Sequence, residues 1–326
     1  MKNVGVTLMD LFKVIVDIDK LHPNFRNLLK EKYAQTVLNE WSLGFVDRDN
    51  KFVKEFQTTF NSSFWELYLH AIFTYLRFKI NYSYKAPDFN ISKNNLTINV
   101  EAVTTNHPKD GTPEYDRIEA LEKLYSSNRT EAGREEILEE IVSLSTERIM
   151  QSIIQKSKKY IENYGKLNHV KGTPFVLAIG SYEQPLFYYQ GTGAIERVLY
   201  GLKEAKYIEG KPFFDFTDNV LKRSNNALIP IGVFNDNKYG HISAVIFNPV
   251  ASFGKVRALQ LKKSSRIFFE TYRYNDYGQK GLKPLLAQWS YILYNRNILL
   301  LRRIITWLVK VMVNHDVKHH GMEKRS

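Results

Sequence analysis

Three acidic residues stand in sequence contexts from which their carboxylates could meet. Glu66 lies in the apolar segment FWELYLHAIFTYL, which leaves few directions toward water. Asp88 follows a proline in an extended segment, and Glu101 lies in the run NVEAV of the next one. A buried ionised carboxylate is costly unless it is paired or bound to a metal. Taken singly, each acid also fits a salt-bridge partner, a turn residue or an exposed strand position, so only the combination indicates a site.

A cluster of these three carboxylates would suit Mg²⁺ or Mn²⁺, because hard cations prefer oxygen ligands and Mg²⁺ takes only one or two carboxylates directly. A bound ion of this kind neutralises charge on a phosphodiester, lowers the pKa of a bound water and stabilises the departing oxygen. The sequence therefore predicts a metal site of Glu66, Asp88 and Glu101 that serves phosphodiester hydrolysis.

A helix and a hairpin must position these acids. Residues 52–78 carry Glu66 and place apolar side chains on nearly all sides of a helical pattern, which predicts a buried helix. Residues 80–91 and 96–103 are rich in β-branched and aromatic types and flank a polar turn at residues 92–95, which predicts two paired strands. Such a hairpin can set its two acids side by side, with the helix acid approaching from beneath.

The rest of the chain predicts an α/β fold in which helices flank one mixed central sheet. Further helices are predicted over residues 24–42, 110–127 and 130–164, and buried strands over residues 174–180, 228–234 and 242–248. The sequence contains no repeat and no long linker. An approximate division is a helical segment 1–52, a core 53–254 and a basic extension 255–326, although the whole chain could also form one domain.

The order of a helix glutamate, Pro-Asp-Phe and a strand ending in Val-Glu-Ala-Val resembles the PD-(D/E)XK nuclease superfamily, which includes many restriction and repair endonucleases. From Trp65 to Pro249 the chain further resembles an uncharacterised bacterial family that looks like a divergent branch of it. The segments that carry this resemblance are WELYLHAIF, APDF, INVEAVTTN, SIIQKSKKY, HVKGTPFVLAI and ISAVIFNP. The resemblance implies a restriction-endonuclease-like fold and, by analogy, a role in restriction or anti-phage defence.

The lysine of the superfamily motif is replaced in this chain. It normally stands two residues after the second acid, and that position holds Val103, which can neither orient a water nor stabilise a developing negative charge. Some branches of the superfamily carry the lysine on a neighbouring helix, and the resemblance places Lys156 in that role. Lys158 and Lys159 match less clearly, and all three lysines also fit ordinary cations near a helix C-terminus.

Four further residues could contact a substrate. Thr104, Thr105 and Asn106 directly follow the acidic strand and could donate hydrogen bonds to a phosphate, although they equally fit the exit of a strand into a loop. His70 lies one helical turn after Glu66 on the same face, where it could touch the substrate or act as a hydrogen-bonded core histidine.

The charge distribution favours a polyanionic partner. The chain has a formal net charge of +12, and residues 255–326 hold 15 Lys and Arg against four Asp and Glu. Such a concentration suits a phosphate backbone or an anionic membrane surface, and it also fits a merely soluble basic surface. The apolar stretch 285–313 contains too many charges for a membrane span. It predicts an amphipathic helix that packs on the core, forms a dimer contact, or faces nucleic acid or a membrane surface.

The lack of cysteine excludes disulfides, zinc-thiolate sites, iron–sulfur clusters and cysteine nucleophiles. The apolar run 4–16 is interrupted by Asp10 and Lys13, unlike the core of a signal peptide, so we expect a cytoplasmic protein.

These observations predict a metal-dependent endonuclease that hydrolyses nucleic acid, expected to be DNA, and that could act as a homodimer. The alternative is a catalytically inactive nuclease-fold module that binds nucleic acid or a partner protein. A membrane-surface protein is a third class, which depends on the C-terminal stretch alone.

Overall fold

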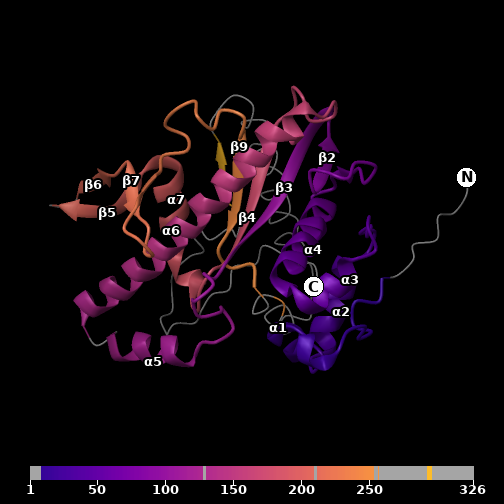
Figure 1. Ribbon diagram of the computed structural model, residues 1–326, viewed down its shortest axis with the longest axis horizontal. Coiled ribbons are helices and arrows are strands. Elements are labelled where there is room, and N and C mark those ends of the chain that lie inside the picture. Colours follow the sequence, from indigo (N-terminus) through magenta and orange to yellow (C-terminus); the bar gives the residue numbers. More distant parts are fainter. Residues whose placement is uncertain (1–8, 128–129, 209–210, 253–255, 257–291, 296–326) are drawn as a thin grey trace, which may run out of the picture.

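A six-stranded mixed sheet lies at the centre of the protein, with helices on both faces (Figure 1). The structure is a computed structural model that describes residues 9–127, 130–208, 211–252, 256 and 292–295. The strand order is β1-β2-β3-β4-β9-β10. Their bounds are β1 Lys79–Ile80, β2 Phe89–Lys93, β3 Leu96–Asn106, β4 Phe175–Tyr182, β9 Ala244–Asn248 and β10 Ile292–Asn295. The predicted mixed α/β architecture is confirmed.

The sheet combines an antiparallel hairpin with a parallel centre. β1 pairs with β2, and β2 with β3, in antiparallel fashion, whereas β3, β4 and β9 run parallel. β10 closes the far edge antiparallel to β9. Parallel neighbours need a crossover connection, and here α6 (Glu131–Glu162) follows β3 and α7 (Gly193–Tyr200) follows β4.

A two-residue turn fixes the register of the hairpin. Asn94 and Asn95 have φ values of 49° and 62°. Two successive residues with positive φ are typical of the turn that matches the right-handed twist of paired strands. The resulting register pairs Phe89 with Val100, so Asp88 lies opposite Glu101 where β2 begins.

The N-terminal helices are shorter than the periodicity predicts. Residues 24–42 form two helices rather than one, and so do residues 52–78. The second pair breaks at Thr59, whose φ and ψ are −121° and 48°. Thr58 and Thr59 each donate a side-chain hydrogen bond to the carbonyl four residues earlier, which competes with regular helix geometry. The bounds are α1 Pro23–Leu28, α2 Lys32–Trp41, α3 Phe52–Thr58, α4 Phe60–Tyr75 and α5 Ile118–Ser127, with short 3₁₀ helices at Ile18–Lys20, Tyr164–Lys166 and Phe187–Gln190.

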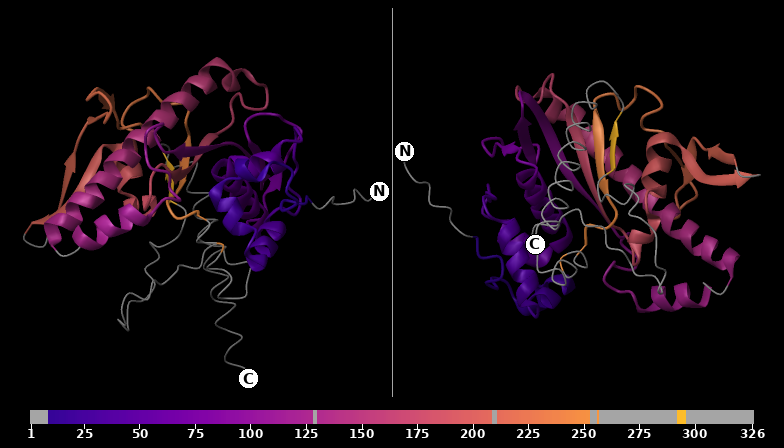
Figure 2. Two further views of the ribbon diagram at one scale, coloured as in Figure 1. Left: turned by 60° about the horizontal axis from the view of Figure 1, so that its bottom comes forward. Right: turned by 180° about the vertical axis from the view of Figure 1, so that it is seen from behind.

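Each face of the sheet has its own apolar core. On one face α4 packs against β3 and β4, and Trp65 donates its indole N–H to the carbonyl of Ala178 at 2.9 Å. On the other face α6 and α7 cover Leu177 and Ile179 of β4. Figure 2 shows α1–α4 gathered on one side of the sheet and α6 crossing the other. Glu66 on α4 and the hairpin acids Asp88 and Glu101 therefore belong to different layers of the fold.

One predicted strand of the central sheet is wrong. Residues 228–234 were expected to form a buried strand, but only Leu228–Pro230 forms β8, which pairs with β7 (Asn219–Leu221) in a separate two-stranded sheet. Leu228 is 67 % exposed, and Gly232 with φ 85° turns the chain away. The hairpin of β5 (Leu202–Ile208) and β6 (Lys211–Phe216), which was not predicted, projects near β7 beyond α7 (Figure 1).

The predicted C-terminal helix at 285–313 lies outside the described residues except for β10. Among the helices that the structure describes, none is long and apolar enough to cross a membrane.

Replacing Trp65 by alanine should lower the free energy of unfolding by about 3–5 kcal/mol, because the change removes a fully buried ring and the indole donor of the Ala178 carbonyl. Urea denaturation provides the measurement. Tyr125→Ala is the control, since that side chain is 69 % exposed and its loss should change stability by about 0.5 kcal/mol or less. Similar losses of unfolding free energy in both variants would contradict a core in which the Trp65 side chain of α4 is a main packing element.

Candidate active site

The hairpin presents Asp88 and Glu101 toward the layer that contains α6. Glu101 pairs with Leu177 of β4, and Leu177 belongs to the apolar core on the α6 side. Asp88 stands opposite Glu101 by register, and its Oδ2 accepts a hydrogen bond of 2.7 Å from the backbone amide of Ala102. The two carboxylates therefore lie side by side on one face, as the sequence predicts.

Glu101 is nearly inaccessible and is held through one of its oxygens. The side chain is 1 % exposed. Its Oε1 accepts the Lys156 ammonium at 2.7 Å, the Lys159 ammonium at 3.3 Å and the Tyr164 hydroxyl at 3.0 Å. Its Oε2 is buried and accepts no hydrogen bond from the described residues. One oxygen of this carboxylate is thus paired with cations and a hydroxyl, and the other has no donor among the described residues.

Lys156, the lysine that the resemblance places on a helix, contacts the acidic residue Glu101. Lys156 comes from the last turns of α6 and is partly buried, with its ammonium on Glu101. Lys159, one turn further, contacts the same oxygen and also lies 4.7 Å from the centre of the Tyr164 ring. Lys158 points elsewhere and pairs loosely with Glu162 at 3.8 Å.

Electrostatic coupling connects Glu66 with the two hairpin acids. Burial raises the pKa of Asp88 to about 7, and the negative charge of Glu101 adds to this, whereas Lys156 acts in the opposite direction. Burial likewise raises the pKa of Glu66 to about 8; the charge of Asp88 adds to the rise, and the Arg48 guanidinium opposes it. The three acids thus share one electrostatic environment, although Glu66 comes from the opposite layer.

Two oxygen donors of the cluster suit a divalent cation. The described part of the chain contains no group of three or more acidic or histidine side chains already arranged as metal ligands. Mg²⁺, however, takes only one or two carboxylates directly and keeps several waters. Asp88 and the unpaired Oε2 of Glu101 are hard oxygen donors on the same sheet face. These two residues fit such an ion, and Glu66 could contribute through a water.

One of the three candidate phosphate ligands at the end of β3 is committed to another residue. Thr105 is buried and donates its hydroxyl hydrogen bond to Glu183 at 2.5 Å, so it cannot serve a substrate. Thr104 accepts a weak bond of 3.4 Å from the Asn106 amide, and the Asn106 carbonyl accepts from Arg148 at 2.9 Å. The exit of a strand into a loop accounts for Thr105, and the substrate role of Thr104 and Asn106 stays a prediction.

His70 is a core histidine. It is 2 % exposed, its Nδ1 donates to the Trp41 carbonyl at 2.9 Å, and its Nε2 lies 3.4 Å from the Thr74 hydroxyl. Burial lowers its pKa. Of the two roles that the sequence allows, the structure shows the hydrogen-bonded core histidine, because the ring is enclosed within the core.

Three residues of the site were missed or left undecided by sequence reasoning. Lys159 could have been found, because it follows Lys156 by three residues and so shares its helix face. Tyr164 lies just beyond the helix end, and burial with the nearby carboxylates raises its pKa, so its hydroxyl stays protonated and donates. Arg48 comes from the loop before α3 and has no local sequence pattern that marks it.

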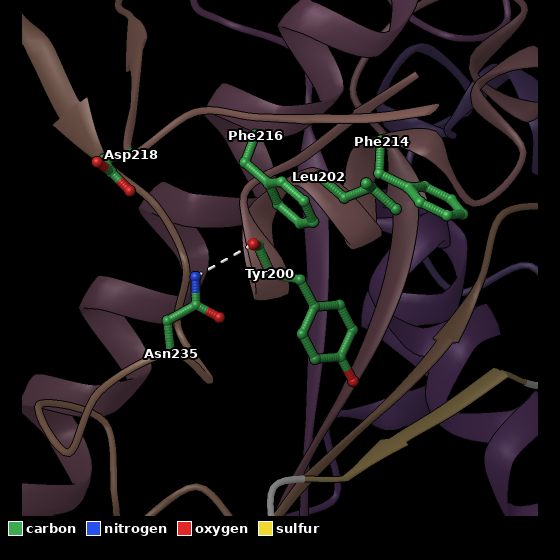
Figure 3. Close-up of a pocket in the computed structure, with 6 residues that line it drawn as sticks. All are labelled: Tyr200, Leu202, Phe214, Phe216, Asp218 and Asn235. Carbon is green, nitrogen blue, oxygen red and sulfur yellow. Dashed lines mark hydrogen bonds between the residues drawn. The ribbon is translucent and has the colours of Figure 1, made fainter. Parts of the chain in front are cut away.

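A separate hollow of about 620 Å³ lies near the β5–β6 hairpin (Figure 3). In this close-up Phe214, Phe216 and Leu202 form a row above the Tyr200 ring, and the Asn235 amide donates to the Tyr200 carbonyl at 3.1 Å. None of the clustered acids lines it. The hollow is lined mostly by apolar side chains, together with Asp218 and Asn235, and it is distinct from the acidic site.

Comparison with family models, with curated proteins and with solved structures finds no match for this chain.

In EDTA, the free energy of unfolding should fall as pH rises from about 6.5 to about 8; below this window the buried His22 and His70, whose pKa values are lowered, change stability in the opposite direction. Asp88 and Glu66 bind a proton more tightly in the native protein than in the unfolded chain, so stability is lost between the ordinary carboxyl pKa of about 4 and the raised values. We expect a fall of roughly 1–3 kcal/mol between about pH 6.5 and about pH 8, measured by urea denaturation.

Asp88→Asn should flatten this pH dependence, whereas the exposed Asp116→Asn should leave it unchanged. Equal pH slopes in the wild type and in Asp88→Asn would contradict the electrostatic account of the cluster.

Proposed function

We propose that this protein is a metal-dependent nuclease that hydrolyses phosphodiester bonds of nucleic acid, and that its core is a restriction-endonuclease-like fold. The observation that carries the proposal is the Lys156 ammonium, 2.7 Å from the buried Glu101 carboxylate. Two neighbouring carboxylates and a third coupled acid can supply metal ligands, and an amine can supply the fixed cation, that metal-dependent phosphodiester hydrolysis uses.

The order of elements supports the proposed fold. A helix with Glu66 precedes an antiparallel hairpin with Asp88 and Glu101, and a long helix then leads to a parallel neighbour of the second hairpin strand. This is the order in which the PD-(D/E)XK resemblance places its helix acid, its two strand acids and its relocated lysine.

Each residue has a distinct task in the proposed reaction. Asp88 and Glu101 would hold Mg²⁺ or Mn²⁺, which when bound supplies charge neutralisation and a more acidic water. Lys156 would stabilise negative charge on the phosphate, since a fixed cation in a water-poor site is effective where charge develops. Tyr164 and Lys159 hold the Glu101 carboxylate in place.

DNA is the proposed substrate, and restriction or anti-phage defence the proposed context. The net charge of +12 supports a polyanionic partner. The alternative is an inactive module of the same fold that binds nucleic acid, and Val103 at the usual lysine position favours it. Cleavage assays separate the two.

Lys156→Met should reduce the rate of metal-dependent cleavage by about a hundredfold or more, because it removes the cation but keeps most of the aliphatic stem. The assay uses single- and double-stranded DNA and RNA with Mg²⁺ or Mn²⁺. Lys158→Met is the matched control: it lies on the same helix with its side chain 73 % exposed and should keep full activity.

Glu101→Ala should abolish cleavage in the same assay. Full activity in Lys156→Met would remove this lysine from the site. The absence of cleavage by the wild type on every substrate would overturn the enzyme in favour of the binding module.

Mg²⁺ or Mn²⁺ should raise the melting temperature of the wild type at pH 8, since a ligand at 100 times its Kd stabilises the native state by about 2.7 kcal/mol. Asp88→Asn and Glu101→Gln should lose most of this metal-induced increase, and the exposed Asp116→Asn should keep it. Differential scanning fluorimetry with and without metal measures the shift. An equal shift in all four proteins would place the metal elsewhere.

A further inference from the structure

The segment that leads into Asp88 is held from two sides. Arg48 donates from Nη1 to the carbonyl of Tyr84 at 2.6 Å, and His169 donates from Nε2 to the carbonyl of Ala86 at 2.8 Å. The Tyr84 and His169 rings are stacked, with centroids 3.7 Å apart. These contacts fix the backbone immediately before the acid and bring a guanidinium to this side of the cluster.

The loop that carries Arg48 is itself anchored. The Asp47 carboxylate accepts backbone hydrogen bonds from Lys51 at 3.1 Å and from Phe52 at 3.0 Å, and so satisfies amides at the start of α3. Arg48 is thus presented from a fixed backbone rather than from a free loop.

Most of the hydrogen-bonding capacity of Arg48 is unused. A guanidinium has five N–H donors, and the bond to the Tyr84 carbonyl is its one hydrogen bond to the part of the chain that the structure describes. No carboxylate among these residues forms an ion pair with it within 4.0 Å, although its charge acts on both Glu66 and Asp88. Lys156 and Lys159, in contrast, are both committed to Glu101.

A partly buried arginine without a paired carboxylate is a natural ligand for an incoming anion. Its planar fork matches two oxygens of a phosphate, and such charge-assisted bonds are about twice as strong as neutral ones. We propose that Arg48 binds the non-bridging oxygens of a substrate phosphate beside the acidic cluster, opposite the lysines of α6. This inference rests on the proposed nuclease function and specifies the phosphodiester contact within it.

The competing role is structural, in which Arg48 only holds the Tyr84 carbonyl. Glutamine removes the charge and keeps a shorter polar side chain, and the slope of affinity against salt then separates the two roles, because only a phosphate contact contributes to it. Arg134→Gln is the matched control: Arg134 is exposed on α6, 22 residues before Lys156, which corresponds to about 33 Å along a helix.

The experiment measures the affinity for a fluorescent duplex DNA by anisotropy, in EDTA to prevent cleavage and over a range of salt concentrations. Arg48→Gln should weaken binding about tenfold or more at low salt, and the slope of log K against log salt should fall by about 0.9, the contribution of one phosphate contact. Arg134→Gln should keep the wild-type slope. A merely structural role would not change the number of phosphates contacted.

Wild-type affinity and slope in a folded Arg48→Gln would overturn the phosphate contact and leave the nuclease proposal standing. Failure of the wild type to bind or cleave any nucleic acid would instead overturn the proposed function, and the inference with it. If Arg48→Gln does not fold, Arg48→Lys is measured instead. Lysine keeps the charge but lacks the planar fork of the guanidinium. A phosphate contact then predicts an affinity for DNA about three- to tenfold lower than that of the wild type, with an unchanged salt slope. Full affinity in Arg48→Lys together with unfolding of Arg48→Gln would assign Arg48 to the fold alone.

Discussion

The burial of the Glu101 carboxylate is the constraint on which the rest of the site depends. An isolated ion in this position would cost several kcal/mol, and the cost falls only if donors reach it from neighbouring elements. They come from α6 and from the turn after it, through Lys156, Lys159 and Tyr164. The end of α6 is thereby held against β3, so the acid that organises the site also fixes the layer above the sheet.

A second buried acid shows how a purely structural carboxylate differs. Glu183 is fully buried, and it accepts hydrogen bonds from Thr105, Ser145 and Gln190. These donors engage both of its oxygens, whereas Glu101 keeps one oxygen without a donor among the described residues. Buried polar groups in folded proteins are normally hydrogen-bonded, so an unsatisfied one requires an explanation. Under the proposed function, this oxygen is available to a divalent cation that Asp88 would share.

The sequence predicts the site correctly where the contacts form between segments that are close together in the chain. Alternation along the hairpin correctly places Asp88 beside Glu101, and a turn with two asparagines fixes that register. Other features depend on contacts between distant segments. The commitment of Thr105 to a residue 78 positions later and the approach of Arg48 from another loop have no local counterpart in the sequence. The apolar run at 228–234 was mistaken for a central strand because composition does not reveal which sheet a short run joins.

Val103 stands where the proposed PD-(D/E)XK resemblance expects a lysine, and in this structure it is a packing residue. Val103 is 5 % exposed and belongs to the same apolar cluster as Ile149 and Ile153 of α6. A lysine here would place its charge among these side chains, where desolvation is unfavourable. Lys156 approaches Glu101 from the facing helix instead, with its stem along the layer and its ammonium at the carboxylate. Val103 then serves packing alone. The amine comes from Lys156 on α6, and the end of this helix is already held at Glu101.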